Sequence, residues 1–317
     1  MDTIELSDRP TESQAHEIVF GYLGHKKFSL KRFPTGLCHY VYEVMPLGQE
    51  PFVLRMGYSA TRGHIAGSVY WTEQLSPLGI PIPKILHKDL LGLYPYTILN
   101  RIPGQDLGYV YSSLKPKQKQ LLAREISHWQ VEVGKLPLGN GYGFGFSPSD
   151  PRLKSSWPEV IDSQIKRARN WILSNNICNV SHVDRVETEA HLLKSYLEAV
   201  QARPFLHDTT TKNVLISKQR LSGIVDIDDV CFGDSLFVIG LTNMALLANG
   251  QDTDYITYWC EAQQVSGIQV KALNFYTALF CVTFMGEIGQ RFNRETVDVD
   301  MNQAYHYEKI LDILLKS

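Results

Sequence analysis

Two stretches of the C-terminal half decide the fold: FLHDTTTKNVLI at residues 205–216 and GIVDIDDVCFGD at residues 223–234. Each combines a β-branched run, which favours a strand, with acidic or amide side chains beside it. Residues 217–220 between the two predicted strands are few enough to form a hairpin turn. Such a hairpin brings Asn213 and Asp226 close together and leaves Asp208 at the mouth of the polar loop.

This predicted arrangement has the chemistry of phosphoryl transfer. An aspartate and an asparagine at strand ends supply the hard oxygen ligands that Mg²⁺ prefers, and a second aspartate remains to orient and deprotonate a hydroxyl. Asp and Asn also cap turns without further function. Three such residues in this order across a hairpin, Asp208, Asn213 and Asp226, favour the catalytic interpretation over three turn caps.

At these residues the chain resembles the aminoglycoside phosphotransferases and their small-molecule kinase relatives, which share a protein-kinase-like fold. The family segment usually reads HGDxxxxN, and the Asp-x4-Asn spacing is kept here by Asp208 and Asn213. The histidine differs, because it stands at 207, directly before the aspartate, and Leu206 occupies its usual position. The resemblance implies that Asp208 is the catalytic base and that Asn213 and Asp226 bind Mg²⁺.

The second stretch carries two further aspartates to which the resemblance assigns roles. Residues 224–229 are similar to the metal-binding strand end of the family, with Asp228 as a candidate helper of Asp226. Gly233 and Asp234 look like a following Gly-Asp pair whose aspartate is structural.

The resemblance extends upstream to a nucleotide site. Residues 33–42 look like the loop that covers the phosphates, with Gly36 as its one glycine, and Arg55 stands where the family places a Lys or Arg for the phosphates. A surface arginine on an edge strand is the alternative interpretation of Arg55. Residues 96–104 resemble the hinge, so the purine is expected to meet the backbone of three consecutive residues: Asn100, Arg101 and Ile102.

One family feature is missing from the sequence. The helix expected to supply a glutamate to Arg55 has Ser68 near that position, and Glu73 follows later in the helix. Whether Glu73 replaces the expected glutamate is left open by the sequence.

The pattern of the whole chain agrees with a two-lobe organisation. Strand-like runs occur at 27–31, 41–45, 51–55 and 96–99, an extended edge segment at 80–86, and one helix at about 60–78. Helical spacing dominates after 103, at 114–133, 157–175, 183–202 and 235–317. We therefore expect an α+β protein with a small antiparallel N-lobe of residues 1–102 carrying one helix, which binds the nucleotide. A larger, mainly helical C-lobe of residues 103–317 is expected to hold the catalytic and acceptor sites.

Composition excludes several classes of function. The 317 residues include 31 Lys and Arg against 33 Asp and Glu, so overall charge does not favour nucleic acid. We find no apolar run of the ~18 residues that span a bilayer, and the N-terminal segment is polar. The five cysteines are scattered, which is typical of reduced thiols. We expect a cytoplasmic protein without nucleic acid or membrane partners.

Three functions are compatible with these residues. The first is a Mg²⁺-dependent kinase that transfers the γ-phosphate of ATP or GTP to a hydroxyl of an aminoglycoside-like, amino alcohol or sugar-like acceptor. The second is a non-catalytic binding or regulatory relative, suggested by the displaced His207 and the missing glutamate. The third, a phosphohydrolase built on Asp226, Asp228 and Asp229, lacks evident companion ligands. The acidic residues Glu287, Asp298 and Asp300 are interpreted as solvated charges on helices rather than as an acceptor site.

Overall fold

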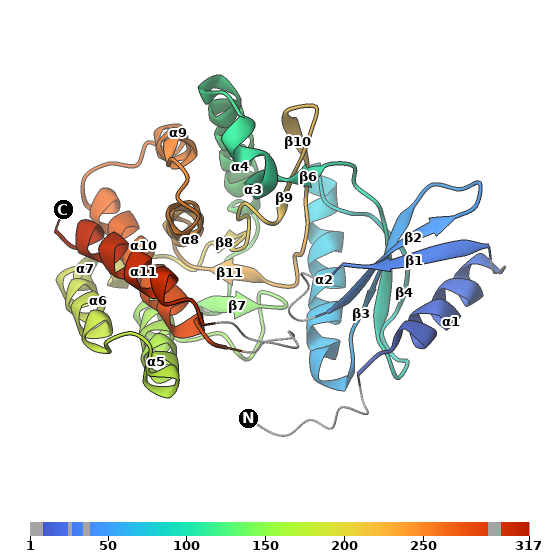
Figure 1. Ribbon diagram of the computed structural model, residues 1–317, viewed down its shortest axis with the longest axis horizontal. Coiled ribbons are helices and arrows are strands. Elements are labelled where there is room, and N and C mark those ends of the chain that lie inside the picture. Colours follow the sequence, from blue (N-terminus) through green and yellow to red (C-terminus); the bar gives the residue numbers. More distant parts are fainter. Residues whose placement is uncertain (1–8, 25–26, 34–38, 291–298, 317) are drawn as a thin grey trace.

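The structure is a computed structural model that describes residues 9–24, 27–33, 39–290 and 299–316. A β-sheet with two helices lies at one end, and a mostly helical part forms the other end (Figure 1). This is the α+β, two-lobe arrangement that the sequence predicts. Gly36 lies outside the described residues.

The N-terminal sheet has five antiparallel strands in the order β1-β2-β3-β5-β4. Their bounds are β1 Phe28–Arg32, β2 Tyr40–Pro46, β3 Phe52–Met56, β4 Ile85–Asp89 and β5 Tyr96–Asn100. Alternation along the central strand β3 sends Phe52, Leu54 and Met56 into one apolar cluster. The side chain of Arg55 therefore belongs to the opposite face of the sheet.

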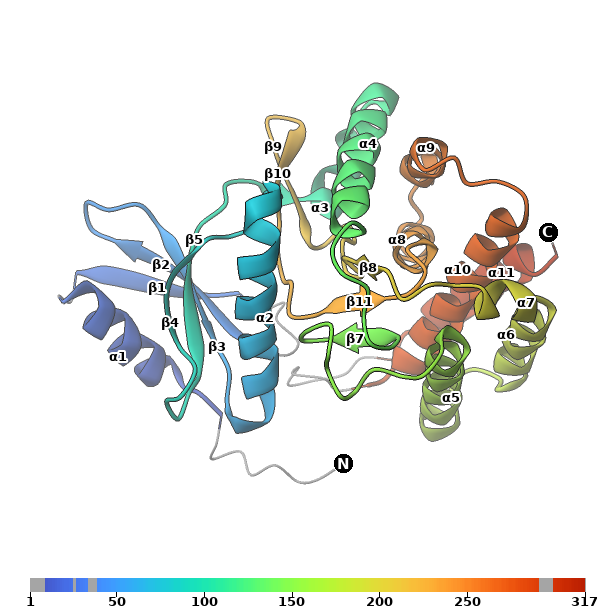
Figure 2. The same cartoon turned by 180° about the vertical axis from the view of Figure 1, so that it is seen from behind.

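Two helices accompany this sheet, although the sequence predicts one. Helix α1 (Glu12–Leu23) buries Ala15 and Val19 in the apolar cluster of the sheet, and a capping box between Thr11 and Gln14 starts it. Helix α2 (Arg62–Leu75) is the predicted helix. It lies between the sheet and the helical part in both views (Figures 1 and 2), and its Trp71 belongs to the core of the helical part.

The helical part is built around one large apolar core. Its helices are α3 Leu107–Val110, α4 Pro116–Val133, α5 Trp157–Asn175, α6 Ser181–Leu192, α7 Lys194–Glu198, α8 Leu236–Ala248, α9 Asp254–Ala262, α10 Ile268–Glu287 and α11 Met301–Leu314. The helix predicted over 183–202 is divided into α6 and α7, because the chain leaves helical geometry at Leu193.

Helix α10 is, within the described ranges, the one helix long and apolar enough to cross a membrane by length and composition. Two-thirds of its apolar window, 67%, is buried inside the protein, where the helix packs against α5, α8 and α11. This packing accounts for its apolar composition.

Two small sheets place the decisive stretches at the junction of the two parts. One has the order β10-β9-β6, with β6 Gln105–Asp106, β9 Val214–Ser217 and β10 Arg220–Ile224; the other has the order β7-β11-β8, with β7 Gly143–Gly145, β8 Pro204–Phe205 and β11 Val230–Phe232. The predicted hairpin is β9–β10. Its turn residues Lys218 and Gln219 have φ of 49° and 62°, as tight two-residue hairpin turns require.

Candidate active site

The loop between β8 and β9 carries Asp208 and Asn213 and is tied to the segment that carries Asp226. The side-chain amide of Asn213 donates to the backbone oxygen of Asp208 at 3.0 Å. The backbone N–H of Val225 donates to the backbone oxygen of Asn213 at 2.9 Å. Asp208 and Asp226 line the same small pocket. The hairpin thus brings the three predicted residues to one place.

A buried glutamine of α4 fixes the start of this loop. The side-chain amide of Gln130 donates to the Leu206 backbone oxygen at 2.8 Å and to Thr209 Oγ1 at 2.9 Å. Its amide oxygen accepts from the Leu206 backbone N–H at 3.0 Å. Gln130 therefore satisfies both backbone groups of the residue that stands where the related sequences have histidine.

His207 forms an ion pair inside the pocket. Its Nε2 lies 2.6 Å from Asp229 Oδ1, and the ring stacks edge-on against Phe144 at 4.8 Å between centroids. Burial opposes the protonated form, but the nearby carboxylates, Asp229 first, together outweigh burial and raise the pKa of His207. In its protonated form His207 places a positive charge next to Asp208.

Asp208 itself is held in a poorly solvated place. Burial raises the pKa of Asp208 above its usual range, the charge of His207 lowers it, and the nearby carboxylate of Asp226 raises it further. Thr210 Oγ1 donates to Asp208 Oδ1 at 3.3 Å. A carboxyl with a raised pKa is suited to accept a proton during a reaction.

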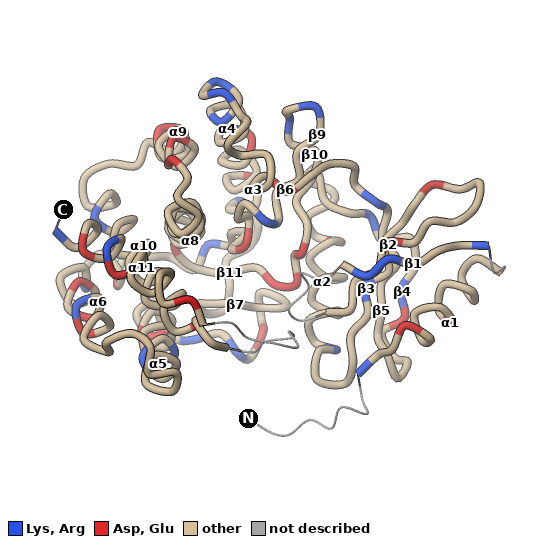
Figure 3. Tube along the Cα trace, viewed as in Figure 1, with Lys and Arg blue, Asp and Glu red and all other residues tan. Residues whose placement is uncertain are grey.

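Arg55 bridges the two parts of the molecule. Its side chain is only 6% exposed, which rules out the alternative of a surface arginine on an edge strand. Nη2 lies 2.6 Å from Asp226 Oδ1, and Nη1 lies 2.5 Å from Asp228 Oδ1. The segment of the two aspartates leads into β11 at the junction of the two parts (Figure 3).

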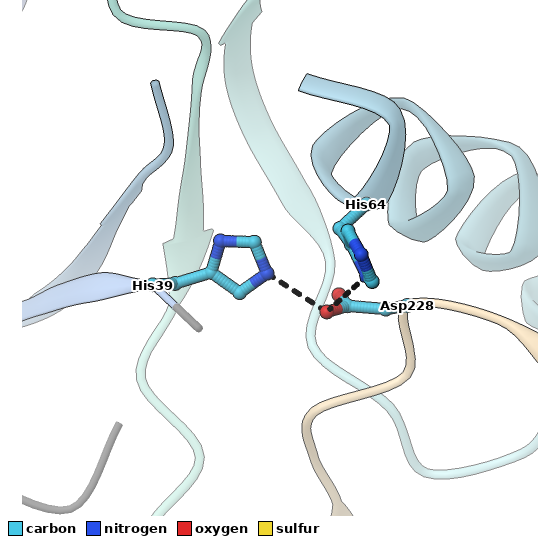
Figure 4. Close-up of side chains that lie close together, drawn as sticks. All are labelled: His39, His64 and Asp228. Carbon is cyan, nitrogen blue, oxygen red and sulfur yellow. Dashed lines mark hydrogen bonds and ion pairs between the residues drawn. The ribbon is translucent and has the colours of Figure 1, made fainter. Parts of the chain in front are cut away.

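Two histidines from the N-terminal part converge on Asp228 (Figure 4). His39 Nε2 lies 2.8 Å from Asp228 Oδ2, and His64 Nδ1 of α2 lies 3.8 Å from the same oxygen. These three side chains could hold a metal ion by spacing. The guanidinium of Arg55 already neutralises Asp228, so we interpret the group as an ion-pair cluster.

Within this cluster the charges of Arg55 and Asp228 stabilise each other. Burial alone would raise the pKa of Asp228, but Arg55 and His39 outweigh burial and hold it well below its usual range. Burial and the charge of Arg55 lower the pKa of His39. Asp228 is thus a buried anion with a cationic partner, a role different from the helper of Asp226 that the resemblance suggests.

Asp226 has the backbone and exposure of a cation ligand. Its φ is 63°, a left-handed conformation that aspartate tolerates better than most residues, and its side chain is 55% exposed. The amide nitrogen of Asn213 is engaged by Asp208, so its amide oxygen is the atom that would face a cation. A carboxylate and an amide oxygen fit Mg²⁺.

The predicted hinge includes β5, and the three predicted purine-contact residues begin at Asn100, the last residue of that strand. The Asn100 backbone N–H donates to the Lys84 backbone oxygen at 3.1 Å, and Asn100 Oδ1 accepts from the Lys84 N–H at 2.5 Å. Arg101 Nε pairs with Glu43 Oε1 at 2.9 Å, and Ile102 is buried. None of these contacts tests whether a purine binds at this segment, so the purine contact stays a prediction.

Glu73 does not take the place of the expected glutamate. Its carboxylate pairs with Lys88 Nζ of β4 at 2.6 Å, and its side chain is 55% exposed, whereas Arg55 is buried.

The remaining acidic candidates have separate environments. Glu287 is half-buried, and burial raises its pKa while Arg167 and Lys212 lower it, so it is not the solvated charge that the sequence suggests. Asp300 caps α11 by accepting from the Asn302 N–H at 2.8 Å. Asp298 lies outside the described residues.

Asp234 is bound on several sides. Tyr196 and Tyr276 donate hydroxyls to it at 2.7 and 2.9 Å, and the Leu236 N–H donates at 3.0 Å. These contacts fit the structural role implied by the resemblance.

Comparison with known proteins places this geometry in a family. The chain belongs to the phosphotransferase enzyme family (APH), whose family model matches residues 29–264. No curated protein matches the chain.

Solved structures show the same fold. Aminoglycoside phosphotransferase APH(4)-Ia superposes with a TM-score of 0.68 at 15% identity, over 96% of this chain and 99% of that chain. A thermostable mutant of APH(4)-Ia in ternary complex with AMP-PNP and hygromycin B gives a TM-score of 0.66 at 15% identity, over 95% and 97% of the two chains. A putative fructosamine-3-kinase from Haemophilus somnus 129PT gives 0.63 at 11% identity, over 95% and 96%. The protein-kinase-like fold is confirmed, and family and fold together support a small-molecule phosphotransferase.

Sequence reasoning missed three residues of this site, Gln130, His39 and His64, and also the pairing of Asp228 with Arg55. Each makes its site contacts with residues far away in the chain, from 76 positions for Gln130 to 189 for His39. No local spacing marks such a contact. The one available signal is that His39 lies within residues 33–42, the stretch that resembles the phosphate loop.

Proposed function

We propose that this protein is a Mg²⁺-dependent kinase that transfers the γ-phosphate of a nucleoside triphosphate to a hydroxyl of a small molecule. The observation that carries the proposal is that Asp208 and Asp226 line one pocket, that Asn213 is hydrogen-bonded to Asp208, and that the buried Arg55 pairs with Asp226. Membership of the phosphotransferase family supports the reaction class.

Each residue has a role that follows from its environment. Asp208 orients the acceptor hydroxyl and accepts its proton, and the raised pKa of Asp208 suits that task. Asn213 and Asp226 would hold Mg²⁺, which when bound neutralises phosphate charge. Arg55 offers a planar fork suited to phosphate oxygens, and its contact with the exposed Asp226 can be exchanged for a phosphate.

In this proposal the two lobes have different functions. Residues 1–102 would bind the nucleotide, with its purine at Asn100, Arg101 and Ile102, and residues 103–317 would carry the base and the acceptor. AMP-PNP and hygromycin B are bound together in the structurally similar mutant of APH(4)-Ia, which supports a nucleotide donor and a small-molecule acceptor here. Aminoglycoside-like, amino alcohol and sugar-like acceptors all suit the same machinery.

A thermal-shift titration tests the nucleotide half of the proposal. Mg·ATP and Mg·GTP are titrated into the wild type and Asp226→Ala. Ligand at about 100 times its Kd stabilises the native state by ~2.7 kcal/mol, which raises the Tm by a few degrees. A shift that needs Mg²⁺ and is lost in the variant is expected.

The preferred nucleotide is then used with a panel of aminoglycosides, amino alcohols and sugars, and release of the nucleoside diphosphate is measured. Acceptor-dependent release is expected. A Mg²⁺-dependent shift without release by any acceptor class, or no shift with either nucleotide, would favour a non-catalytic binding protein with a kinase fold.

A further inference from the structure

Arg55 divides its two terminal nitrogens between carboxylates of very different exposure. Nη2 faces Asp226, whose side chain is 55% exposed, and Nη1 faces Asp228, whose side chain is 15% exposed. A ligand arriving from solvent can compete for the contact with Asp226. The contact between Arg55 and Asp228 is therefore expected to remain when a ligand binds.

Helix α2 does not supply a carboxylate to Arg55, but it leaves space for the backbone of Asp228 to approach. Its single acidic residue, Glu73, is engaged by Lys88. Gly67 of the same helix lies so close to the Asp228 backbone that a Cβ there would overlap the Asp228 carbonyl oxygen. The glycine therefore lets the segment before β11 approach α2.

The carboxylate of Asp228 is held in one orientation by groups from three elements. Oδ1 faces Arg55 of β3, Oδ2 accepts from His39 Nε2 just before β2, and His64 of α2 stands 3.8 Å from Oδ2 (Figure 4). The two oxygens thus have separate partners, and rotation of the carboxylate would break both contacts.

We propose that Asp228 is the positioning residue of Arg55: it holds the guanidinium at the phosphate site, in the role that the family resemblance gives to a helix glutamate. The proposal rests on the proposed function, since it concerns the same nucleotide site. Asp228 touches neither nucleotide nor metal in this proposal. It acts through Arg55 alone, and His39 and His64 keep it in place.

The test compares ligands with and without phosphates. We would measure the Kd of Mg·ATP and of adenosine by calorimetry for the wild type, Asp228→Asn, Arg55→Gln and the double variant. Glu73→Gln, which removes the carboxylate of α2 that pairs with Lys88, is the matched control.

Because Asp228 acts on phosphates through Arg55, Asp228→Asn should weaken Mg·ATP by about tenfold or more and adenosine by less than about twofold. In the Arg55→Gln background the same substitution should add less than about twofold, because the group it positions is gone. Glu73→Gln should leave both affinities unchanged.

Three results would overturn the proposal: unchanged Mg·ATP affinity in Asp228→Asn, an equal loss for adenosine, or an undiminished effect in the Arg55→Gln background. The last would make Asp228 an independent ligand. If Asp228→Asn does not fold, His39→Gln replaces it in the same cycle and is judged by the same pattern. A wild type that binds adenosine but gains nothing from Mg²⁺ and phosphates would overturn the proposed function, and this proposal with it.

Discussion

His207 and Asp229 form an ion pair, with 2.6 Å between Nε2 and Oδ1, directly beside Asp208. The histidine occupies the position next to the aspartate, where related sequences have glycine, and its charge lowers the pKa of Asp208 against the effect of burial. The pair therefore sets the pH range in which Asp208 can act as a base.

Removing this charge should move the pH dependence of turnover. In His207→Gln the pKa of Asp208 rises further, since the one cause that lowers it most is lost. A base works in its deprotonated form, so activity disappears as pH falls through its pKa, and a higher pKa moves that loss to higher pH. The pH profile of kcat measures the shift.

Asp229→Asn provides the companion variant. Without the carboxylate that raises its pKa, His207 loses its charge at a lower pH than in the wild type, so the acidic limb should move in the same direction. If the acidic limb of the pH profile does not move in either variant, the ion pair does not control the pKa of Asp208.

Replacing Asp208 by asparagine should separate binding from chemistry. Asp208→Asn keeps the size of the side chain and removes the base, so kcat should fall by about 10²–10⁴-fold. The affinity for Mg·ATP should stay near that of the wild type. Turnover close to the wild-type value would remove Asp208 from the mechanism.

Replacing Gln130 should reduce the free energy of unfolding by more than the loss of a buried side-chain amide usually does. Gln130→Leu removes three hydrogen bonds. The Leu206 backbone N–H loses its side-chain acceptor, and the Leu206 oxygen keeps only the 3.3 Å bond from Thr209 Oγ1. We expect a loss of about 2–4 kcal/mol in the free energy of unfolding, measured by denaturant titration. The kcat should fall as well, because the loop that carries Asp208 starts at Leu206. An unchanged midpoint would contradict this account.

Gly67→Ala should reverse the usual effect of alanine in a helix. Alanine normally stabilises a helix interior by about 1 kcal/mol over glycine. At Gly67 the added Cβ would overlap the Asp228 carbonyl oxygen and the ring of Phe146, so destabilisation and weaker Mg·ATP binding are expected.

Gly21→Ala in α1 is the control for that variant, because nothing lies within 4 Å of a Cβ there. Its Tm should rise slightly, and its nucleotide affinity should not change. If the two variants change Tm and nucleotide affinity equally, the close approach of Asp228 to α2 does not require glycine at position 67.

Local patterns in the sequence were sufficient for most strands of the N-terminal sheet, for the β9–β10 hairpin and for the central residues of the site. The short strands β6, β7, β8 and β11 were not predicted. Period-2 alternation marks β1 and β2 because neighbouring side chains of a strand point to opposite faces. The turn after β9 is short, and a short hairpin has few ways to close, so the proximity of Asn213 and Asp226 could be predicted from spacing. Asp208 was identified by a different route, because the Asp-x4-Asn spacing matches the segment that the sequence resembles.

The partners of Arg55 were decided only by the tertiary structure. Asp226 is 171 positions away from Arg55 in the chain, and His39 is 189 positions away from Asp228. Whether these side chains meet depends on how the sheet, α2 and the segment before β11 pack together, which residue periodicity does not encode. The sequence could show that Arg55 and the aspartates exist, and that a helix glutamate is missing. Asp228 reaches Arg55 because the segment before β11 packs closely against α2 at Gly67. That contact depends on how β3, α2 and this segment fit together in space.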